Sequence, residues 1–218
     1  IPDRVYLLAD DIFDEMVSRN VGEYRYPLGG KLYVFNKNEN IGFIKGHMCS
    51  PAIATQAEDL IAGGVKELIH VGYAGGLQPE LVPGEIILTD GAFNDTAVAR
   101  LYGYDYDIIH SSKDLTNEIE EMITSAEILY KRGFHWTTDA GYRETWGQVM
   151  DYRDKGALCV EMEGVGLFTI ANYRKCVATG IYVVSDVYLE DDWKLGWEGN
   201  DIKKAVGEII DMIIKSIR

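Results

Sequence analysis

The pattern of apolar and polar positions along the chain predicts strands that alternate with helices. Short apolar, β-branched runs predict strands, and apolar residues at helical spacing predict helices. The expected strands are 4–9, 31–36, 41–45, 67–71, 85–89, 134–138, 157–160 and 179–184. The expected helices are 10–18, 51–62, 115–132, 142–153, 164–173 and 201–217. This alternation predicts one α/β domain over residues 1–218, and the early hairpin predicts a mixed sheet.

Residues 156–188 predict a strand–helix–strand unit that carries three acids. Glu161 and Glu163 follow the first strand of this unit, and Asp186 follows the second. In open α/β sheets ligands bind at the carboxyl ends of strands, so these acids are expected to converge on one site. By contrast, residues 91–113 show no clean period and are expected to form a loop.

Composition narrows the class of ligand. The net charge of -14 over 218 residues argues against a nucleic-acid partner and against an anionic membrane surface. No apolar run approaches the ~20 residues of a membrane span, and no signal peptide is expected. The cysteines Cys49, Cys159 and Cys176 form no CxxC pair, which favours a reducing, cytoplasmic compartment. A small-molecule ligand is expected, with no metal or resident cofactor.

Several motifs follow one another in an order typical of one family. They are GH at 46–47, GVKELIHVGYAGGL at 64–77, PGEIILTDGAFND at 83–95, TTDAGYRET at 137–145, VEMEG at 160–164 and VSD at 184–186. Together they resemble the nucleoside phosphorylase superfamily, which includes purine nucleoside phosphorylase, uridine phosphorylase and the adenosylhomocysteine-type nucleosidases. The resemblance implies a three-layer α/β/α sandwich around a mixed, partly barrel-like sheet. It also implies dimers that build a hexamer, and cleavage of an N-glycosidic bond by phosphate or by water.

The resemblance assigns roles to the three acids. It implies that Glu163 grips the ribose hydroxyls, with Glu161 beside it and Met162 against the sugar face. Asp186 is implied to be the general acid at N7 of a purine, which requires a buried setting. The alternative interpretation is that Glu163 is only an acid at the start of a helix, where the helix dipole favours it. The alternative interpretation of Asp186 is a residue that starts a turn at the end of a strand.

The expected phosphate site departs from the family pattern. Gly72, His70 and Tyr73 occupy its positions, but His70 replaces an arginine and Tyr73 replaces a serine or threonine. In the N-terminal loop, Ala9 and Phe13 stand at approximately the glycine and arginine positions. The glycine segment is, on sequence alone, as consistent with a tight exit from a strand.

The N-terminal acids keep hydrolysis open as an alternative. Nucleosidases of this superfamily use an acid on the same loop to activate water, which here indicates Asp14 and, less strongly, Asp11 or Glu15. These acids would also repel a phosphate dianion. The other interpretation of this acidic run is a solvated first turn of a helix.

The base site is expected along TTDAGYRET. The resemblance implies that Tyr142 stacks on the base, although Gly141 replaces the phenylalanine that usually accompanies it. Gly75 is expected beside the base, and Arg143, with Glu144 next to it, could contact the edge of the base or form a surface pair.

A flap at 190–197 is expected to bring Trp193 or Trp197 over the base site. The sequence thus predicts a phosphorylase that acts on a purine nucleoside or uridine, with phosphate as co-substrate. A nucleosidase and a catalytically weak nucleoside-binding homologue remain the alternatives.

Overall fold

The computed structural model describes residues 1–189, 193–196 and 199–217, and for 193–195 it describes the backbone only. The strands are β1 Arg4–Leu8, β2 Gly22–Tyr26, β3 Leu32–Phe35, β4 Asn38–Lys45, β5 Glu67–Gly76, β6 Ile86–Asp95, β7 Ile108–His110, β8 Lys131–Thr138, β9 Cys159–Glu161, β10 Val177–Tyr188 and β11 Trp193–Leu195. The helices are α1 Asp10–Ser18, α2 Ser50–Ala62, α3 Ala97–Leu101, α4 Lys113–Ser125, the 3₁₀ turn η1 Gly141–Arg143, α5 Trp146–Asp154, α6 Gly164–Arg174 and α7 Asn200–Ser216.

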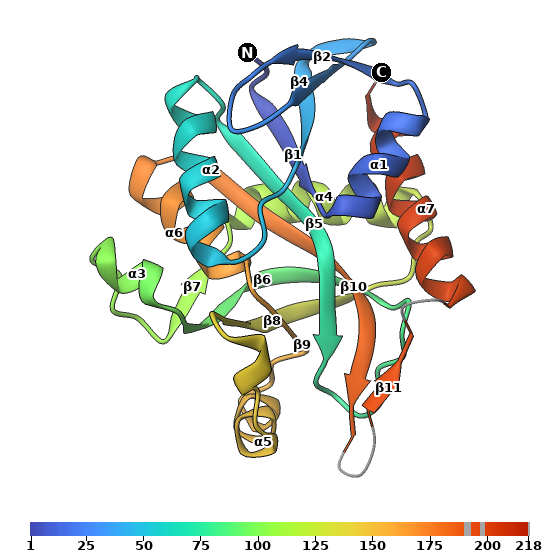
Figure 1. Ribbon diagram of the computed structural model, residues 1–218. Helices are drawn as coiled ribbons and strands as arrows, with labels where there is room; N and C mark the ends of the chain where they lie inside the picture. Colours follow the sequence, from blue (N-terminus) through green and yellow to red (C-terminus); the bar gives the residue numbers. More distant parts are fainter. Residues whose placement is uncertain (190–192, 197–198, 218) are drawn as a thin grey trace.

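The strands form one mixed sheet that closes on itself at one end. Their order is β11-β10-β6-β8-β9-β5-β1-β4-β3-β2, and β10 also pairs with β5, so that β10, β6, β8, β9 and β5 form a barrel. Helices α1, α4 and α7 pack on one side of the sheet, and α2 and α6 pack on the other (Figure 1). The predicted α/β class, with a mixed and partly barrel-like central sheet, is therefore confirmed.

Burial on both faces explains the continuous apolar strands. In β1, Tyr6 and Leu8 belong to the core under α1 and α7, whereas Val5 and Leu7 belong to the core under α2 and α6. Side chains alternate between the two faces of a strand, so a strand covered on both sides is apolar throughout. β1 thus links the two cores.

Three expected boundaries differ most from the structure. α4 ends at Ser125 rather than at residue 132, because the chain turns at Glu127 (φ +57°) and then enters β8. β5 and β6 each run to ten residues, five more than the sequence pattern indicated. In β5 the extension consists of the glycine segment itself, which is therefore strand and not a loop.

Other parts of the fold also differ from the expectations. The region expected to be loop contains α3 and β7, and β2 was not predicted at all. The two strands of the unit expected at 156–188, β9 and β10, do not pair with each other: β9 runs antiparallel to β5, whereas β10 runs parallel to it on the other edge. Asp186 also lies inside β10 and not beyond its end.

No helix in the described ranges is long and apolar enough to cross a membrane.

Candidate active site

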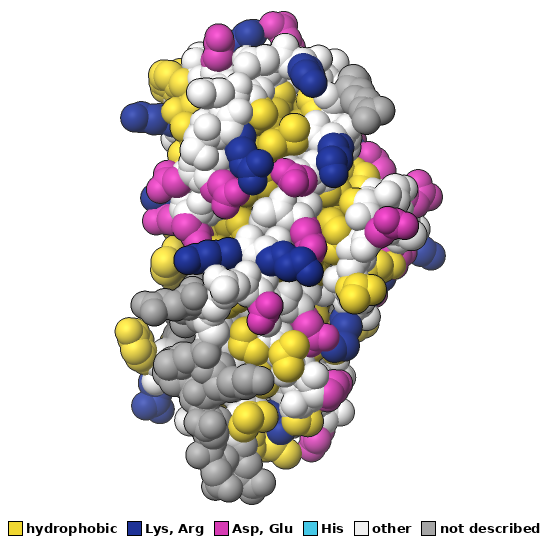
Figure 2. Space-filling view, turned by 90° about the vertical axis from the view of Figure 1, so that its right-hand side faces the viewer, with side chains coloured by type: hydrophobic (Ala, Val, Ile, Leu, Met, Phe, Trp, Pro, Cys, Tyr) yellow, Lys and Arg dark blue, Asp and Glu magenta, His cyan; other side chains and the backbone are white. Residues whose placement is uncertain are grey.

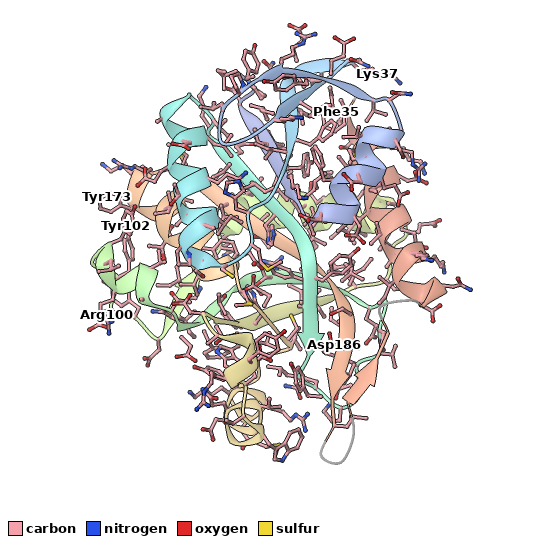
Figure 3. All side chains as sticks on the ribbon, viewed as in Figure 1. Phe35, Lys37, Arg100, Tyr102, Tyr173 and Asp186 are labelled. Carbon is pink, nitrogen blue, oxygen red and sulfur yellow. The ribbon has the colours of Figure 1, made fainter. Side chains whose placement is uncertain are left out.

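Gly75 lies at the centre of the candidate site. Its register partners are Val160 in β9 and Asp186 in β10, on opposite edges of β5. A Cβ atom placed on Gly75 would lie 3.3 Å from Oδ2 of Asp186 and 2.8 Å from Cε2 of Tyr188. Glycine is therefore required for close packing of these side chains. Figure 3 shows Asp186 where β5 and β10 run side by side.

Asp186 is buried, with 5% of its surface exposed. The hydroxyl of Ser185 donates a hydrogen bond of 2.5 Å to its Oδ1. Tyr188 lies two residues further along β10, so its side chain shares a face with that of Asp186. The predicted general acid is thus held in a buried, oriented position.

Glu161 is held by the protein through both of its carboxylate oxygens. Thr137 donates a hydrogen bond of 2.5 Å to Oε1, and Nε2 of His135 lies 3.0 Å from the same atom. The backbone amides of Glu163 and Gly164 each donate to Oε2 at 2.8 Å. Burial alone would raise the pKa of Glu161, but the interaction with His135 and the hydrogen bond from Thr137 lower it to about 2. This geometry favours a role in anchoring the start of α6 over the predicted contact with ribose.

His135 was given no role from the sequence. Its ring is fully buried, and its Nδ1 lies 2.6 Å from the hydroxyl of Thr89 in β6. Two of its partners, Thr89 and Glu161, are distant in the sequence, so no local motif reveals them. The one available signal was a polar residue within an otherwise buried strand.

Glu163 is held from a different direction. The amide of Cys49 donates a hydrogen bond of 2.6 Å to Oε1, and the amide of Met162 donates to Oε2 at 3.3 Å. Its side chain makes no capping hydrogen bond to α6, which argues against the helix-cap interpretation. Burial, followed by the nearby charge of Glu161, raises the pKa of Glu163 to about 8.

His70 cannot replace an arginine electrostatically. Burial lowers its pKa to about 4, so the ring is neutral at pH 7. Its ring stands edge-on to Tyr182, with centroids 5.6 Å apart, and a Cβ on Gly72 would lie 2.9 Å from its Cε1. His70 and Gly72 therefore share one side of β5, and neither supplies a positive charge.

A metal ion does not fit this cluster well. One ligand atom from each of His70, Glu161 and Glu163 lies within 4.8 Å of the others. However, both oxygens of Glu161 are already occupied by the donors described above, and those of Glu163 accept from backbone amides. The two carboxylates of the cluster are therefore committed to the protein.

Tyr73 points away from His70, toward α1. Its hydroxyl donates a hydrogen bond of 2.6 Å to Oδ2 of Asp11. Tyr73 and His70 are three residues apart in one strand, so they lie on opposite faces. The residues predicted to bind phosphate are consequently not brought together into one cradle.

Asp11 is the N-terminal acid that reaches β5. Asp14 is exposed and makes no hydrogen bond or ion pair with the site residues in the described ranges. Glu15 pairs with Arg19 at 2.8 Å. The sequence preferred Asp14, whereas the contacts favour Asp11 as the acid near the glycine segment.

Most arginines in the described ranges are already paired. The ion pairs are Arg4 with Glu67 and Glu118, Arg19 with Glu15 and Asp211, Arg25 with Glu39, Arg132 with Asp90 and Glu120, and Arg174 with Glu58. Arg153, which lies beside the ends of β5 and β10, donates to the carbonyls of Leu77 and Tyr188. On the face shown in Figure 2, basic side chains are interspersed with acidic ones.

The predicted base-binding residues separate into two groups. Gly75 lies against Asp186, as described above, whereas Tyr142 is fully exposed and Arg143 is exposed on η1. Glu144 is the side chain of this segment that turns inward, because Tyr188 donates a hydrogen bond of 2.5 Å to its Oε2. Trp197 and the side chain of Trp193, expected in the flap, lie outside the described residues.

Two surface hollows of about 480 Å³ each lie elsewhere. One lies beside the turn at 82–86 and the N-terminal part of α7, and the other lies between α4 and the end of α7. Neither contains a residue predicted to bind ligand, so they do not bear on the candidate site.

Comparison with known proteins identifies the family of the chain. A family model described as the phosphorylase superfamily matches residues 2–215. Purine nucleoside phosphorylase DeoD-type from Exiguobacterium sibiricum is 29% identical over 85% of this chain and 78% of its own length. The same-named protein of Exiguobacterium sp. is 30% identical over 85% of this chain and 77% of its own length. Purine nucleoside phosphorylase DeoD-type 1 from Shewanella oneidensis is 27% identical over 85% of this chain and 78% of its own length.

Proposed function

Because the chain belongs to the phosphorylase superfamily, we propose that it cleaves the N-glycosidic bond of a purine ribonucleoside and releases the free base. The observation that carries this proposal is the position of Gly75, which pairs with Asp186 on one edge and with Val160, next to Glu161, on the other. The segment proposed to bind ribose and the acid proposed to protonate the base thereby lie on either side of Gly75. The purine assignment follows the names of the relatives.

In this proposal Glu163 binds the ribose hydroxyls and Met162 packs against the sugar. A carboxyl with a pKa of about 8 lies close to the balance between its protonated and ionised forms at neutral pH. Positive charge that develops on the ribose would favour the ionised form and would be stabilised by it. Glu161 positions Glu163 through the amide at the start of α6.

In this proposal Asp186 is the general acid for the departing base. Its buried carboxyl, oriented by Ser185, would deliver a proton to N7, or share one with it, as negative charge develops on the purine. Gly75 leaves room for the base to approach this carboxyl.

We favour water over phosphate as the nucleophile. Binding of a phosphate dianion is favoured by positive charge, but the ring of His70 is neutral. The hydroxyl of Tyr73 donates its hydrogen bond to Asp11, and the guanidinium of Arg153 donates to backbone carbonyls. Tyr73 and Gly75 share a face of β5, so Asp11 lies on the side that carries Asp186. A carboxylate there would activate water and repel phosphate.

Phosphorolysis is the second candidate, with phosphate as co-substrate. The relatives described above are named purine nucleoside phosphorylases, and their similarity extends over 85% of this chain. A neighbouring subunit of a dimer-based hexamer would then have to supply the missing cation. Light scattering of the purified chain tests whether such an oligomer forms.

Base release tests the proposed reaction. The purified chain is incubated with adenosine, inosine, guanosine or uridine, and free base is quantified by chromatography. Glu163→Gln and Asp186→Asn should each lower the rate by about a hundredfold or more, since each removes a group acting in the transition state. Asp154→Asn, an exposed acid on α5, is the control and should match the parent. Equal rates in all four proteins would refute the assignment.

A further inference from the structure

Glu144 is an acid for which the proposed reaction has no role. It follows η1, beyond the end of β8, and is half-buried. Its Oε2 accepts the hydrogen bond from Tyr188, which is the only hydrogen-bond partner found for this carboxyl among the described residues. Burial raises the pKa of Glu144, the hydrogen bond from Tyr188 opposes this shift by favouring the ionised form, and the nearby charge of Asp186 adds to it. A half-buried carboxylate that forms no ion pair with any cation of the described residues is unfavourable, so its presence here calls for an explanation.

Glu144 lies between Met162, which we propose packs against the sugar, and Asp186, which we propose protonates the base. A Cβ on Gly141 would lie 3.5 Å from Oε1 of Glu144 and 3.6 Å from Sδ of Met162. On the other side, Tyr188 links Glu144 to the space over Gly75 that Asp186 also borders. One oxygen of Glu144 is thus fixed by Tyr188, and the other faces the gap left by the small residue Gly141.

The chemistry of a purine decides what such an oxygen can accept. N7 and the substituent at C6 lie on the same edge of the ring: adenine carries an amino donor there, and guanine carries a carbonyl acceptor. An ionised carboxylate only accepts hydrogen bonds, so it binds the amino group and repels the carbonyl. With Asp186 at N7, the neighbouring carboxylate would meet the C6 substituent.

We propose that Glu144, held by Tyr188, contacts the C6 substituent of the base and makes the site selective for 6-aminopurine nucleosides over 6-oxopurine nucleosides. This inference rests on the proposed function, because it takes Asp186 to lie at N7. Gly141 contributes by leaving space at the position where a larger side chain would separate Glu144 from the base.

The test compares kcat/KM for adenosine, inosine and purine riboside, which has no substituent at C6. The parent should prefer adenosine over inosine. Glu144→Gln should reduce that preference by about tenfold to a hundredfold, because a charge-assisted hydrogen bond is lost. The loss should be smaller for purine riboside. Tyr188→Phe, which removes the hydroxyl that holds Glu144, should shift the preference in the same direction. Asp154→Asn is the matched control and should leave the preference unchanged.

Calorimetric binding of adenine and hypoxanthine separates this inference from the proposed reaction. Tighter binding of adenine by the parent, with the difference reduced in Glu144→Gln, supports the inference even if no nucleoside is cleaved. Base release with an adenosine-to-inosine ratio that is the same in the parent and in Glu144→Gln overturns it while leaving the proposed reaction intact. Equal losses on all three nucleosides in Glu144→Gln would also overturn it, since they would indicate a structural role.

Discussion

The backbone amide of Cys49 donates a hydrogen bond of 2.6 Å to the carboxylate of Glu163, which lies 114 residues further along the chain. To make this bond, Cys49 adopts a φ of +73° and a ψ of 148°, a conformation that is essentially restricted to glycine. Such strain is maintained when surrounding contacts fix it, and it recurs at functional sites. The start of α2 therefore helps to orient the carboxyl that we propose binds ribose.

Cys49→Gly should stabilise the protein by about 1 kcal/mol, because relief of backbone strain exceeds the entropic cost of glycine. The amide that contacts Glu163 is retained. Chemical denaturation measures the difference, with Cys49→Ala as the comparison that removes the thiol and keeps the strain. A glycine variant less stable than the alanine variant would show that the conformation is not strained.

The contribution of Glu163 to the free energy of unfolding should fall as the pH rises from about 4.5 to about 8. Its pKa is raised from 4.5 to about 8 on folding, so within this window the folded state retains a proton that the unfolded state has lost. The stabilisation by Glu163 is fully present below pH 4.5, and it is lost as the pH rises through the folded-state pKa of about 8. Urea unfolding at pH 5, 6.5 and 8 should show a decline in the parent that Glu163→Gln lacks. Parallel curves for the two proteins would contradict the raised pKa.

His135→Leu should destabilise the fold by about 3–5 kcal/mol, because it leaves the buried carboxylate of Glu161 without one of its partners. Combining it with Glu161→Gln should cost clearly less than the sum of the two single changes, since the pair acts as a unit. The exposed pair Lys204 and Glu208 is the control, and Lys204→Ala should cost at most about 1 kcal/mol. Additive losses at His135 and Glu161 would rule out direct coupling.

Asp11→Asn should lower the rate of base release by about a hundredfold or more, whereas Asp14→Asn should change it little. The reason is that Tyr73 holds the Asp11 carboxylate at β5, whereas Asp14 makes no such contact with the site residues in the described ranges. Tyr73→Phe should produce a smaller loss than Asp11→Asn. If Asp14→Asn proved the more damaging change, the base would be the residue that the sequence preferred.

The parts of the fold that could be predicted are those with a strong local pattern. β1 and α7 are apolar at strand and helix spacing because each buries most of its apolar side chains. β2 was not predicted because its central residues are exposed and carry no apolar alternation. β5 was cut short because glycines normally end strands, whereas here close approach of Asp186 and Tyr188 requires glycine within one.

In the candidate site, too, only residues that belong to a local sequence motif could be predicted. Motifs indicated Glu163 and Asp186, since their neighbours in the sequence belong to the pattern. The partners of Glu161 could not be found in this way, because His135 reaches it from β8 across 26 residues. Asp11 and Glu144 depend equally on contacts to Tyr73 and Tyr188 that only the folded chain reveals.

The most direct test of the account is the identity of the sugar product in the presence of excess phosphate. The purified chain is incubated with adenosine, and adenine, ribose and ribose 1-phosphate are quantified together. The account predicts adenine and free ribose in equal amounts, at a rate that phosphate does not increase. Formation of ribose 1-phosphate would contradict water as the nucleophile, and the absence of adenine would contradict cleavage of a 6-aminopurine nucleoside.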